Sequence, residues 1–264
     1  MRIIEKFIEG KKADQALCED KLLITEDFIA VVDGVTAKSS RTWDGKTGGI
    51  AAAEAICKAI ELFPADISCE NAITNLTKAV SFLYDENEEP GSAAAGVIIL
   101  SRFRKEIWSV GDCCCIINGT KHLHEKTLDL ILSAERCAFL ENAVKNGATE
   151  EELLKNDIGR DHIMPKLKAQ HKYANTVCEL GFGVINGSAV PERFIVTYKV
   201  HEGDTIILAS DGYPHLRDTL EESESLLKKE LTENPLCYKT YKSTKGLREG
   251  STSFDDRTYI KLIL

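Results

Sequence analysis

Apolar residues recur along this chain in short runs that are typical of β-strands. Residues 21–25 and 28–32 flank the acidic dipeptide Glu26-Asp27, which predicts a β-hairpin. Short polar turns separate several later runs, and such links favour antiparallel pairing because parallel strands need long crossovers. The later strand-like runs cover residues 93–100, 106–110, 113–117, 121–124, 194–200, 205–209 and 258–264.

Four segments show the apolar period of an α-helix instead. In residues 48–63 apolar side chains recur at helical spacing until Pro64 ends the pattern. Ser68 is a suitable N-cap for the next segment, because its hydroxyl can accept a hydrogen bond from the first turn. The predicted helical segments cover residues 48–63, 68–83, 127–171 and 220–231.

The order of these elements lacks the strict alternation of strand and helix that a doubly wound parallel sheet requires. We therefore expect an α+β fold in which two antiparallel sheets pack as a sandwich covered by helices. The chain has no internal repeat and no low-complexity linker. We expect a single domain over residues 1–264, in which residues 127–171 form a helical insertion.

Composition narrows the class of protein. The chain has 264 residues, of which 43% are hydrophobic and 28% charged, as in a globular protein with a sizeable core. Its net charge of -9, without a cluster of Lys and Arg, argues against a nucleic-acid partner. The apolar runs have strand length, well short of the roughly 18 residues that cross a bilayer. No secretory signal is recognisable, so we expect a cytoplasmic protein without a membrane span.

The nine cysteines do not indicate a zinc site, because no C-x-x-C pair occurs among them. Three of them, residues 113–115, lie in a strand-like run where adjacent side chains point to opposite faces. We interpret the cysteines as reduced residues of the core.

Carboxylates collect at the ends of the predicted strands. Two buried runs end on Asp-Gly, at Asp33-Gly34 and Asp211-Gly212, and the run 107–110 is followed by Gly111-Asp112. Asp255-Asp256 precedes the last strand. Carboxylate oxygens are the ligands that Mg²⁺ and Mn²⁺ prefer, which indicates a metal centre.

Such a centre suits the hydrolysis of phosphate esters. Two ions can share one carboxylate and one water, and Asp33 is the candidate bridge. A water that bridges two cations loses a proton near neutral pH and can attack a phosphoryl group, whose charge the same ions offset. No Ser or Cys nucleophile is then needed.

Six motifs carry a resemblance over nearly the whole chain, in sequence order. They are Glu19-Asp20, Asp33-Gly34, Gly91-Ser92-Ala93-Ala94, Gly111-Asp112-Cys113, Ala209-Ser210-Asp211-Gly212 and Asp255-Asp256-Arg257-Thr258. With them the chain resembles the metal-dependent PP2C-type (PPM) serine/threonine protein phosphatases. The resemblance implies a four-layer α-β-β-α sandwich. It also implies that a water bridging two Mg²⁺ or Mn²⁺ ions hydrolyses phosphoserine and phosphothreonine esters of a phosphorylated protein substrate.

The resemblance also implies a role for each matching residue. Asp33 would bridge the two ions, and Asp20 would orient a metal-bound water from behind, so both are candidate catalytic residues. Asp112 would join Asp211 at a third, weaker ion. The implied metal ligands are Glu19, Asp33, the carbonyl of Gly34, Asp112, Asp211 and Asp255.

The chain departs from the family pattern at the positions that bind the substrate phosphate. Many members carry an Arg four residues before the first Glu, where this chain has Gln15. The loop after Gly34 also lacks the usual glycine-rich continuation. Lys38 and Arg41 in that loop, or Lys46 further along it, are the candidates to bind the substrate phosphate, since a cation there complements a dianion.

Two other functions remain open. The departures at Gln15 and in the loop after Gly34 suit a catalytically impaired module that keeps the fold for interaction or regulation. The same centre could also act on a small phosphorylated metabolite. A haloacid-dehalogenase-type phosphatase is disfavoured, because no Asp-x-Asp follows either strand end. The physiological substrate and the oligomeric state are left open by the sequence.

Overall fold

The structure is a computed structural model that describes residues 1–36, 38, 41–84 and 92–264. The acidic tract 85–89 and Gly91, the first residue of the third motif, lie outside the described residues. Within the described ranges, no helix combines the length and the apolar character that a bilayer span needs.

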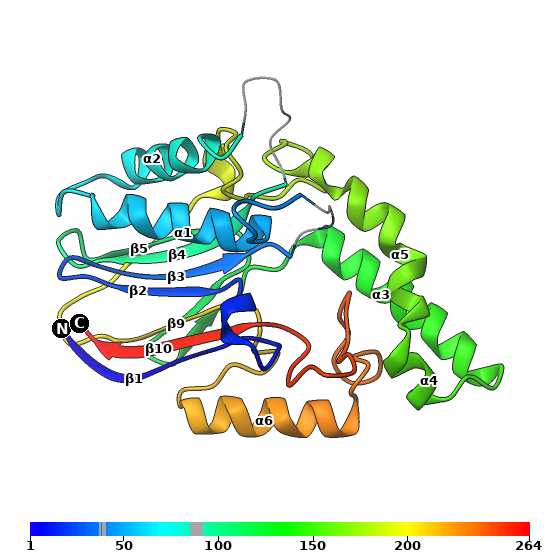
Figure 1. The fold of residues 1–264 in the computed structure, drawn as a ribbon. Coiled ribbons are helices and arrows are strands. Elements are labelled where there is room, and N and C mark those ends of the chain that lie inside the picture. Colours follow the sequence, from blue (N-terminus) through cyan, green and yellow to red (C-terminus); the bar gives the residue numbers. More distant parts are fainter. Residues whose placement is uncertain (37, 39–40, 85–91) are drawn as a thin grey trace.

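Two five-stranded antiparallel sheets form the centre of the fold (Figure 1), as the strand pattern predicts. The first sheet has the order β2-β3-β4-β5-β8, with β2 (Lys21–Ile24), β3 (Phe28–Gly34), β4 (Ala95–Ser101), β5 (Glu106–Val110) and β8 (Val196–Lys199). The second has the order β1-β10-β9-β6-β7, with β1 (Arg2–Glu9), β10 (Arg257–Ile263), β9 (Thr205–Ala209), β6 (Cys114–Ile117) and β7 (Thr120–His122).

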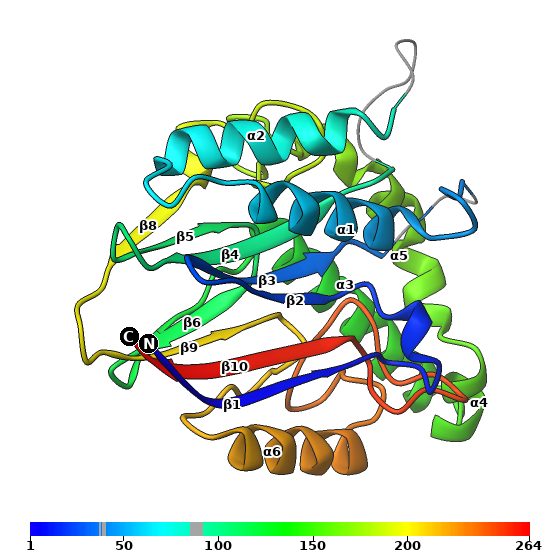
Figure 2. The ribbon, with the colours of Figure 1, turned by 60° about the vertical axis from the view of Figure 1, so that its left-hand side comes forward.

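Helices cover the outer faces of both sheets, which confirms the four-layer α-β-β-α sandwich. The helices α1 (Gly48–Glu61) and α2 (Cys69–Ser81) pack on the first sheet, and α6 (Leu220–Glu233) packs on the second (Figures 1 and 2). Ser68 caps α2 as predicted, because its side chain accepts a hydrogen bond from the backbone N–H of Asn71.

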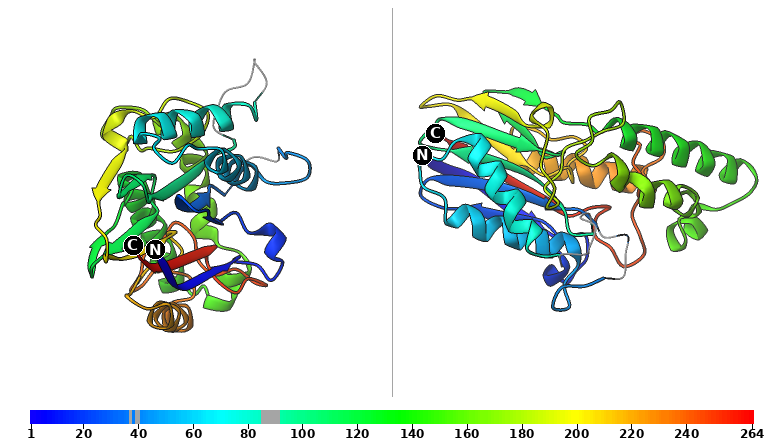
Figure 3. Two further views of the ribbon diagram at one scale, coloured as in Figure 1. Left: turned by 90° about the vertical axis from the view of Figure 1, so that its left-hand side faces the viewer. Right: turned by 90° about the horizontal axis from the view of Figure 1, so that it is seen from above.

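Three further helices form the helical lobe, residues 127–169. They are α3 (Thr127–Lys145), α4 (Glu150–Lys155) and α5 (Ile158–Ala169). The helical lobe extends from one end of the sandwich, whereas both chain termini lie at the opposite end (Figures 1 and 3). These three helices lie within the range 127–171.

The alternation of side chains in β3 shows why its whole run is apolar. Ile29 and Val31 face the second sheet, whereas Phe28, Ala30 and Val32 face α1 and α2. Because side chains alternate with period two, the next residue, Asp33, belongs to the face between the two sheets. The buried strand thus directs one carboxylate toward the opposite sheet.

The cysteines also follow the prediction. Cys113 and Cys115 pack between the two sheets, whereas Cys114 packs on the side of α6. All nine cysteines are free thiols.

The strand β1 was not predicted from the sequence. It is an edge strand whose first residues are exposed, and its register against β10 shifts between Ile3 and Glu5. The apolar alternation that identifies a half-buried strand is broken there.

Candidate metal centre

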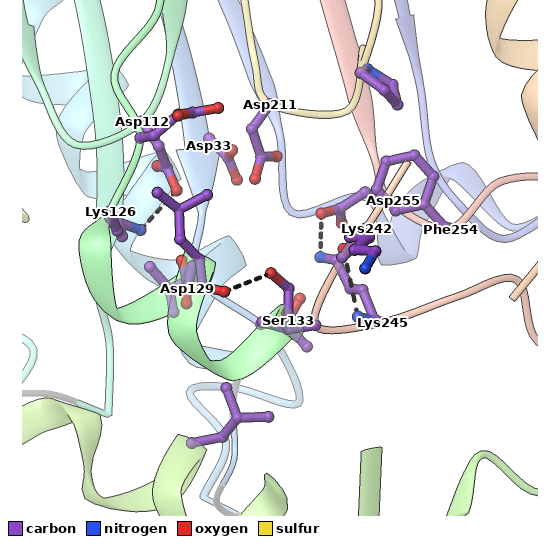
Figure 4. A pocket seen from close by; sticks show the side chains of 18 of the residues that line it. Asp33, Asp112, Lys126, Asp129, Ser133, Asp211, Lys242, Lys245, Phe254 and Asp255 are labelled. Atoms are coloured by element: carbon purple, nitrogen blue, oxygen red, sulfur yellow. Dashed lines mark hydrogen bonds and ion pairs between the residues drawn. The ribbon is translucent and has the colours of Figure 1, made fainter. Parts of the chain in front are cut away.

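Strand ends from both sheets meet at the edge of the sandwich that faces the helical lobe. In the first sheet β3 and β5 both run toward this edge, so Asp33 ends β3 and Asp112 follows β5. In the second sheet Asp211 follows β9, and Asp255 precedes the antiparallel neighbour β10. The topology therefore brings the four acids around one cavity (Figure 4).

Asp33 and Asp211 point toward one another from different sheets (Figure 4). Neither side chain has a hydrogen bond or an ion pair with a described residue. Burial and the nearby Asp211 raise the pKa of Asp33 well above its ordinary range. Asp211 opens onto the cavity, yet desolvation and the neighbouring Asp255 raise its pKa to about 7. This pair is thus a site where negative charge is disfavoured unless a cation compensates it.

Gly34 lines the cavity beside Asp33, and only glycine fits this position. A Cβ atom there would lie 2.6 Å from the carbonyl oxygens of both Glu19 and Gly49. The close approach keeps the Glu19 segment packed directly against the end of β3.

Glu19 lies behind the cavity rather than in its lining. Its carboxylate accepts hydrogen bonds from the hydroxyl of Thr47 at 2.7 Å and from that of Thr36 at 2.8 Å. The ammonium nitrogen of Lys11 lies 3.1 Å from its Oε2 atom. Glu19 is 3% exposed and already well supplied with donors.

Asp20 is buried behind the same strand ends. Its Oδ2 accepts a hydrogen bond from the Thr258 hydroxyl at 2.8 Å. Burial and the charge of Asp256 raise the pKa of Asp20 to about 8, although hydrogen bonds from Ser210 and Thr258 oppose this. Asp20 is therefore a group that holds its proton near neutral pH.

Of the adjacent acids at the start of β10, Asp255 lines the cavity. Asp256 instead accepts hydrogen bonds from the backbone N–H groups of Lys11, at 2.7 Å, and Glu19, at 3.1 Å. Asp256 thereby ties the N-terminal loop to β10.

Lysines occupy part of the acidic cluster, and the sequence did not suggest them. The ammonium nitrogen of Lys11 lies 3.1 Å from Glu19, 3.3 Å from Asp255 and 3.1 Å from Asp256. These three carboxylates raise the pKa of Lys11 above its ordinary value despite its burial.

Two further lysines reach the cavity acids. The Lys126 ammonium lies 2.6 Å from Oδ2 of Asp112, and Lys245 forms an ion pair with Asp255 (Figure 4). Although burial opposes ionisation of Asp255, Lys245 and Lys11 lower its pKa. Each of these acids therefore has a counter-charge from the protein.

The donor chemistry suits a hard divalent ion, since carboxylate and carbonyl oxygens converge on one cavity. In the described part of the chain, however, no three Asp, Glu, His or Cys side chains are arranged to hold an ion as they stand. This agrees with the pairing of Asp112 and Asp255 to lysines. Asp33 and Asp211, which lack such partners, are the carboxylates best placed to receive a cation.

The cavity has a volume of about 260 Å³, and the helical lobe forms one wall through residues of α3 and α5. Lys38 lines this cavity, and its ammonium group donates a hydrogen bond to the carbonyl oxygen of Thr36 at 3.2 Å. Arg41 is not part of the lining: its guanidinium carbon lies 4.6 Å from the ring centroid of Trp43. Lys46 is also outside the lining and pairs with Glu54 at 2.6 Å. Of the candidate phosphate-binding residues, the structure thus brings only Lys38 to the cavity.

Several solved serine/threonine phosphatases share this fold. The chain matches PstP from Mycobacterium tuberculosis with a TM-score of 0.52 and 14% sequence identity, over 99% of each chain. It matches Stp1 from Staphylococcus aureus with a TM-score of 0.51 and 15% identity, over 98% of this chain and 94% of that one. It also matches the PPM phosphatase MsPP from Mycobacterium smegmatis with a TM-score of 0.50 and 13% identity, over 100% of both chains.

No protein-family profile and no curated protein sequence matches the chain. The fold is that of the PP2C-type (PPM) serine/threonine phosphatases, so the resemblance carried by the six motifs is confirmed at the level of the fold.

Proposed function

We propose that this protein is a Mg²⁺- or Mn²⁺-dependent phosphatase that hydrolyses phosphoserine and phosphothreonine esters. The observation that supports this most is the pair Asp33 and Asp211, two carboxylates that face each other without a partner in the described structure. They lie at strand ends of a fold shared with PstP, whose catalytic domain has been solved with two manganese ions; the TM-score is 0.51 at 13% identity over 99% of this chain and 98% of that one.

In this proposal Asp33, Asp211, Asp255 and the Gly34 carbonyl hold two ions, Glu19 contributes from behind, and Asp112 with Asp211 serves a weaker third site. Divalent ions held there would increase the acidity of a water and offset the charge of the phosphoryl group.

In this proposal, residues of the chain also orient the Asp33 carboxylate and a water, and bind the substrate phosphate. Pairing of β3 with β4, where Asp33 lies opposite Gly96, fixes the backbone at Asp33, so its carboxylate keeps one direction. Asp20 holds a proton in the layer behind and orients a water of the centre. Lys38, which lines the cavity, contacts the substrate phosphate.

A second candidate function is favoured by the ion pairs of Lys11, Lys126 and Lys245 with the acids. If these lysines neutralise the centre permanently, the chain is a non-catalytic interaction or regulatory module with a phosphatase fold. The two functions differ in whether the protein binds Mn²⁺ and turns over a phosphate ester.

Hydrolysis of p-nitrophenyl phosphate by the purified protein with Mn²⁺ tests the proposal. We expect turnover that EDTA and Asp33→Asn abolish, whereas Asp66→Asn, at an exposed acid outside the cavity lining, leaves it unchanged. The absence of turnover with any phosphate ester, together with the absence of Mn²⁺ binding by calorimetry, would favour the non-catalytic module. A comparison of phosphopeptides with small phosphate esters at equal concentration separates a protein substrate from a metabolite.

A further inference from the structure

The Lys and Arg side chains that line the cavity fall into two groups. Three of them form ion pairs with acids: Lys126, Lys242 and Lys245. The other two, Lys38 and Arg160, have no ion pair with any residue in the described ranges. Their positive charge is therefore available to a ligand.

Hydrogen bonds hold the Arg160 side chain in place but engage only some of its guanidinium donors. It lies in the first turn of α5 and is 7% exposed, and its Nη1 donates hydrogen bonds to the carbonyl and hydroxyl oxygens of Thr244 at 2.6 and 3.3 Å. Its Nε and Nη2 groups have no partner among the described residues. A buried guanidinium with free donors on a cavity wall is suited to bind an anion.

Arg136 in the same helical lobe shows the contrast. Its side chain is fully buried, and Nε and Nη2 donate to the carboxylate of Asp157 at 3.1 and 2.6 Å. Its remaining donors reach backbone carbonyls of the segment after α6. Each guanidinium nitrogen of Arg136 thus donates a hydrogen bond within the protein, whereas Arg160 keeps donors for a ligand.

Lys38 lies close enough to Arg160 to experience its charge. Burial, and then the charges of Arg160, Lys245 and Lys126, lower the pKa of Lys38 to about 8. Asp129 acts on Lys38, and Asp157 and Asp255 act on Arg160, but none of these acids forms an ion pair with either cation, so a bound anion would stabilise both.

The N-terminal loop does not supply a competing anion site. Gln15 is exposed, and its Oε1 accepts a hydrogen bond from the backbone N–H of Gly10 at 2.9 Å within the same loop. Lys11 is enclosed by three carboxylates, which would repel a phosphate.

We propose that Arg160 of the helical lobe, together with Lys38, binds the phosphoryl group of the substrate. This inference rests on the proposed function and assigns the phosphate contact to a helix outside the sandwich. The planar fork of Arg160 offers two donors to two phosphate oxygens, and Lys38 adds a point charge.

Binding of inorganic phosphate to the Mn²⁺-loaded protein, measured by calorimetry, tests the inference without requiring turnover. We expect Arg160→Met to weaken phosphate binding at least tenfold and Arg160→Lys to weaken it less. Lys38→Met should also weaken it, whereas Lys242→Met, a lysine of the same cavity that lies 4.0 Å from Glu141, should change it less than twofold. If the protein hydrolyses p-nitrophenyl phosphate, Arg160→Met and Lys38→Met should raise KM more than they lower kcat.

Unchanged phosphate affinity in folded Arg160→Met and Lys38→Met would overturn the inference, whether or not the wild type is a phosphatase. If Arg160→Met does not fold, Arg160→Lys and Lys38→Met provide the same comparison. Phosphate binding that depends on Arg160 in a protein without turnover would support the inference and contradict the proposed function. Turnover in a protein whose phosphate binding does not depend on Arg160 would support the proposed function and contradict the inference.

Discussion

The ammonium nitrogen of Lys126 lies 2.6 Å from Oδ2 of Asp112, and the two side chains are only 17% and 19% exposed. Lys126 immediately precedes α3, whereas Asp112 follows β5. One ion pair therefore joins the helical lobe to the acidic end of the first sheet. A cation that binds at Asp112 must compete with this lysine.

We expect Lys126→Met to increase the affinity of the Asp112 site for Mn²⁺ by about tenfold, because it removes a competing positive charge at contact distance. Calorimetric titration with Mn²⁺ measures both the affinity and the number of ions bound. Lys121→Met, at an exposed lysine of β7, is the control. Identical titrations for wild type and Lys126→Met would show that Asp112 is not a metal ligand.

Asp211→Asn should have opposite effects on the metal-free and the metal-loaded protein. Without metal the amide removes a carboxyl group whose ionisation burial and the neighbouring acids disfavour, so the melting temperature should not fall and is expected to rise. With Mn²⁺ the variant should lose most of the stabilisation that the ion gives the wild type, since binding to the folded state alone stabilises it. Thermal melts in EDTA and in Mn²⁺ measure both effects. A metal-free Asp211→Asn that melts well below the wild type would contradict the repulsion.

The stability of the metal-free protein should decrease as the pH rises from 5 to 8. Asp20 and Asp211 have pKa values raised to about 8 and about 7, so the folded state retains protons that the unfolded state loses near pH 4. The folded state then binds more protons in this window, and the free energy of unfolding falls with pH. Asp255, whose pKa is lowered, acts only at lower pH.

Melting curves in EDTA at pH 5 and pH 8 test this. We expect the melting temperature to be lower at pH 8 by about 3 °C or more, the change that roughly 1 kcal/mol produces in a chain of this size. Mn²⁺ should reduce the difference, because it favours the ionised carboxylates. A melting temperature that rises from pH 5 to pH 8 in EDTA would contradict the raised pKa values.

Arg136→Met should destabilise the helical lobe, because it leaves Asp157 and several carbonyl oxygens without their donor. Loss of one partner of a buried ion pair costs about 3–5 kcal/mol. Urea unfolding measures this cost, and Lys166→Met is the control because its pair with Glu135 is exposed. A loss no larger than that of Lys166→Met would show that the Arg136 pair does not hold the lobe.

The acids of the centre could be predicted because their signal is local. A buried, β-branched run that ends on Asp-Gly identifies Asp33 and Asp211 without knowledge of the fold, and the antiparallel sheets then follow from short turns. The edge strand β1 could not be predicted in this way, because exposed positions interrupt its apolar alternation.

Apart from Lys38, the basic residues around the cavity could not be predicted from the sequence. Lys11 meets Asp255 across 244 positions, and Arg160 reaches the cavity from the helical lobe. An isolated Lys or Arg has no sequence pattern that separates a solvated side chain from one that enters an acidic cluster. Their roles depend on tertiary structure alone.

Because Asp33 belongs to one sheet and Asp211 to the other, no backbone hydrogen bond fixes the distance between their carboxylates. That distance depends on how the apolar side chains between the sheets pack, such as Val31 and Leu208. A smaller side chain deep in this layer would change the packing of the two sheets and therefore the distance between the two carboxylates. It would thus change ion affinity from a position remote from the cavity. The packing inside the sandwich would thus influence ion affinity as well as stability.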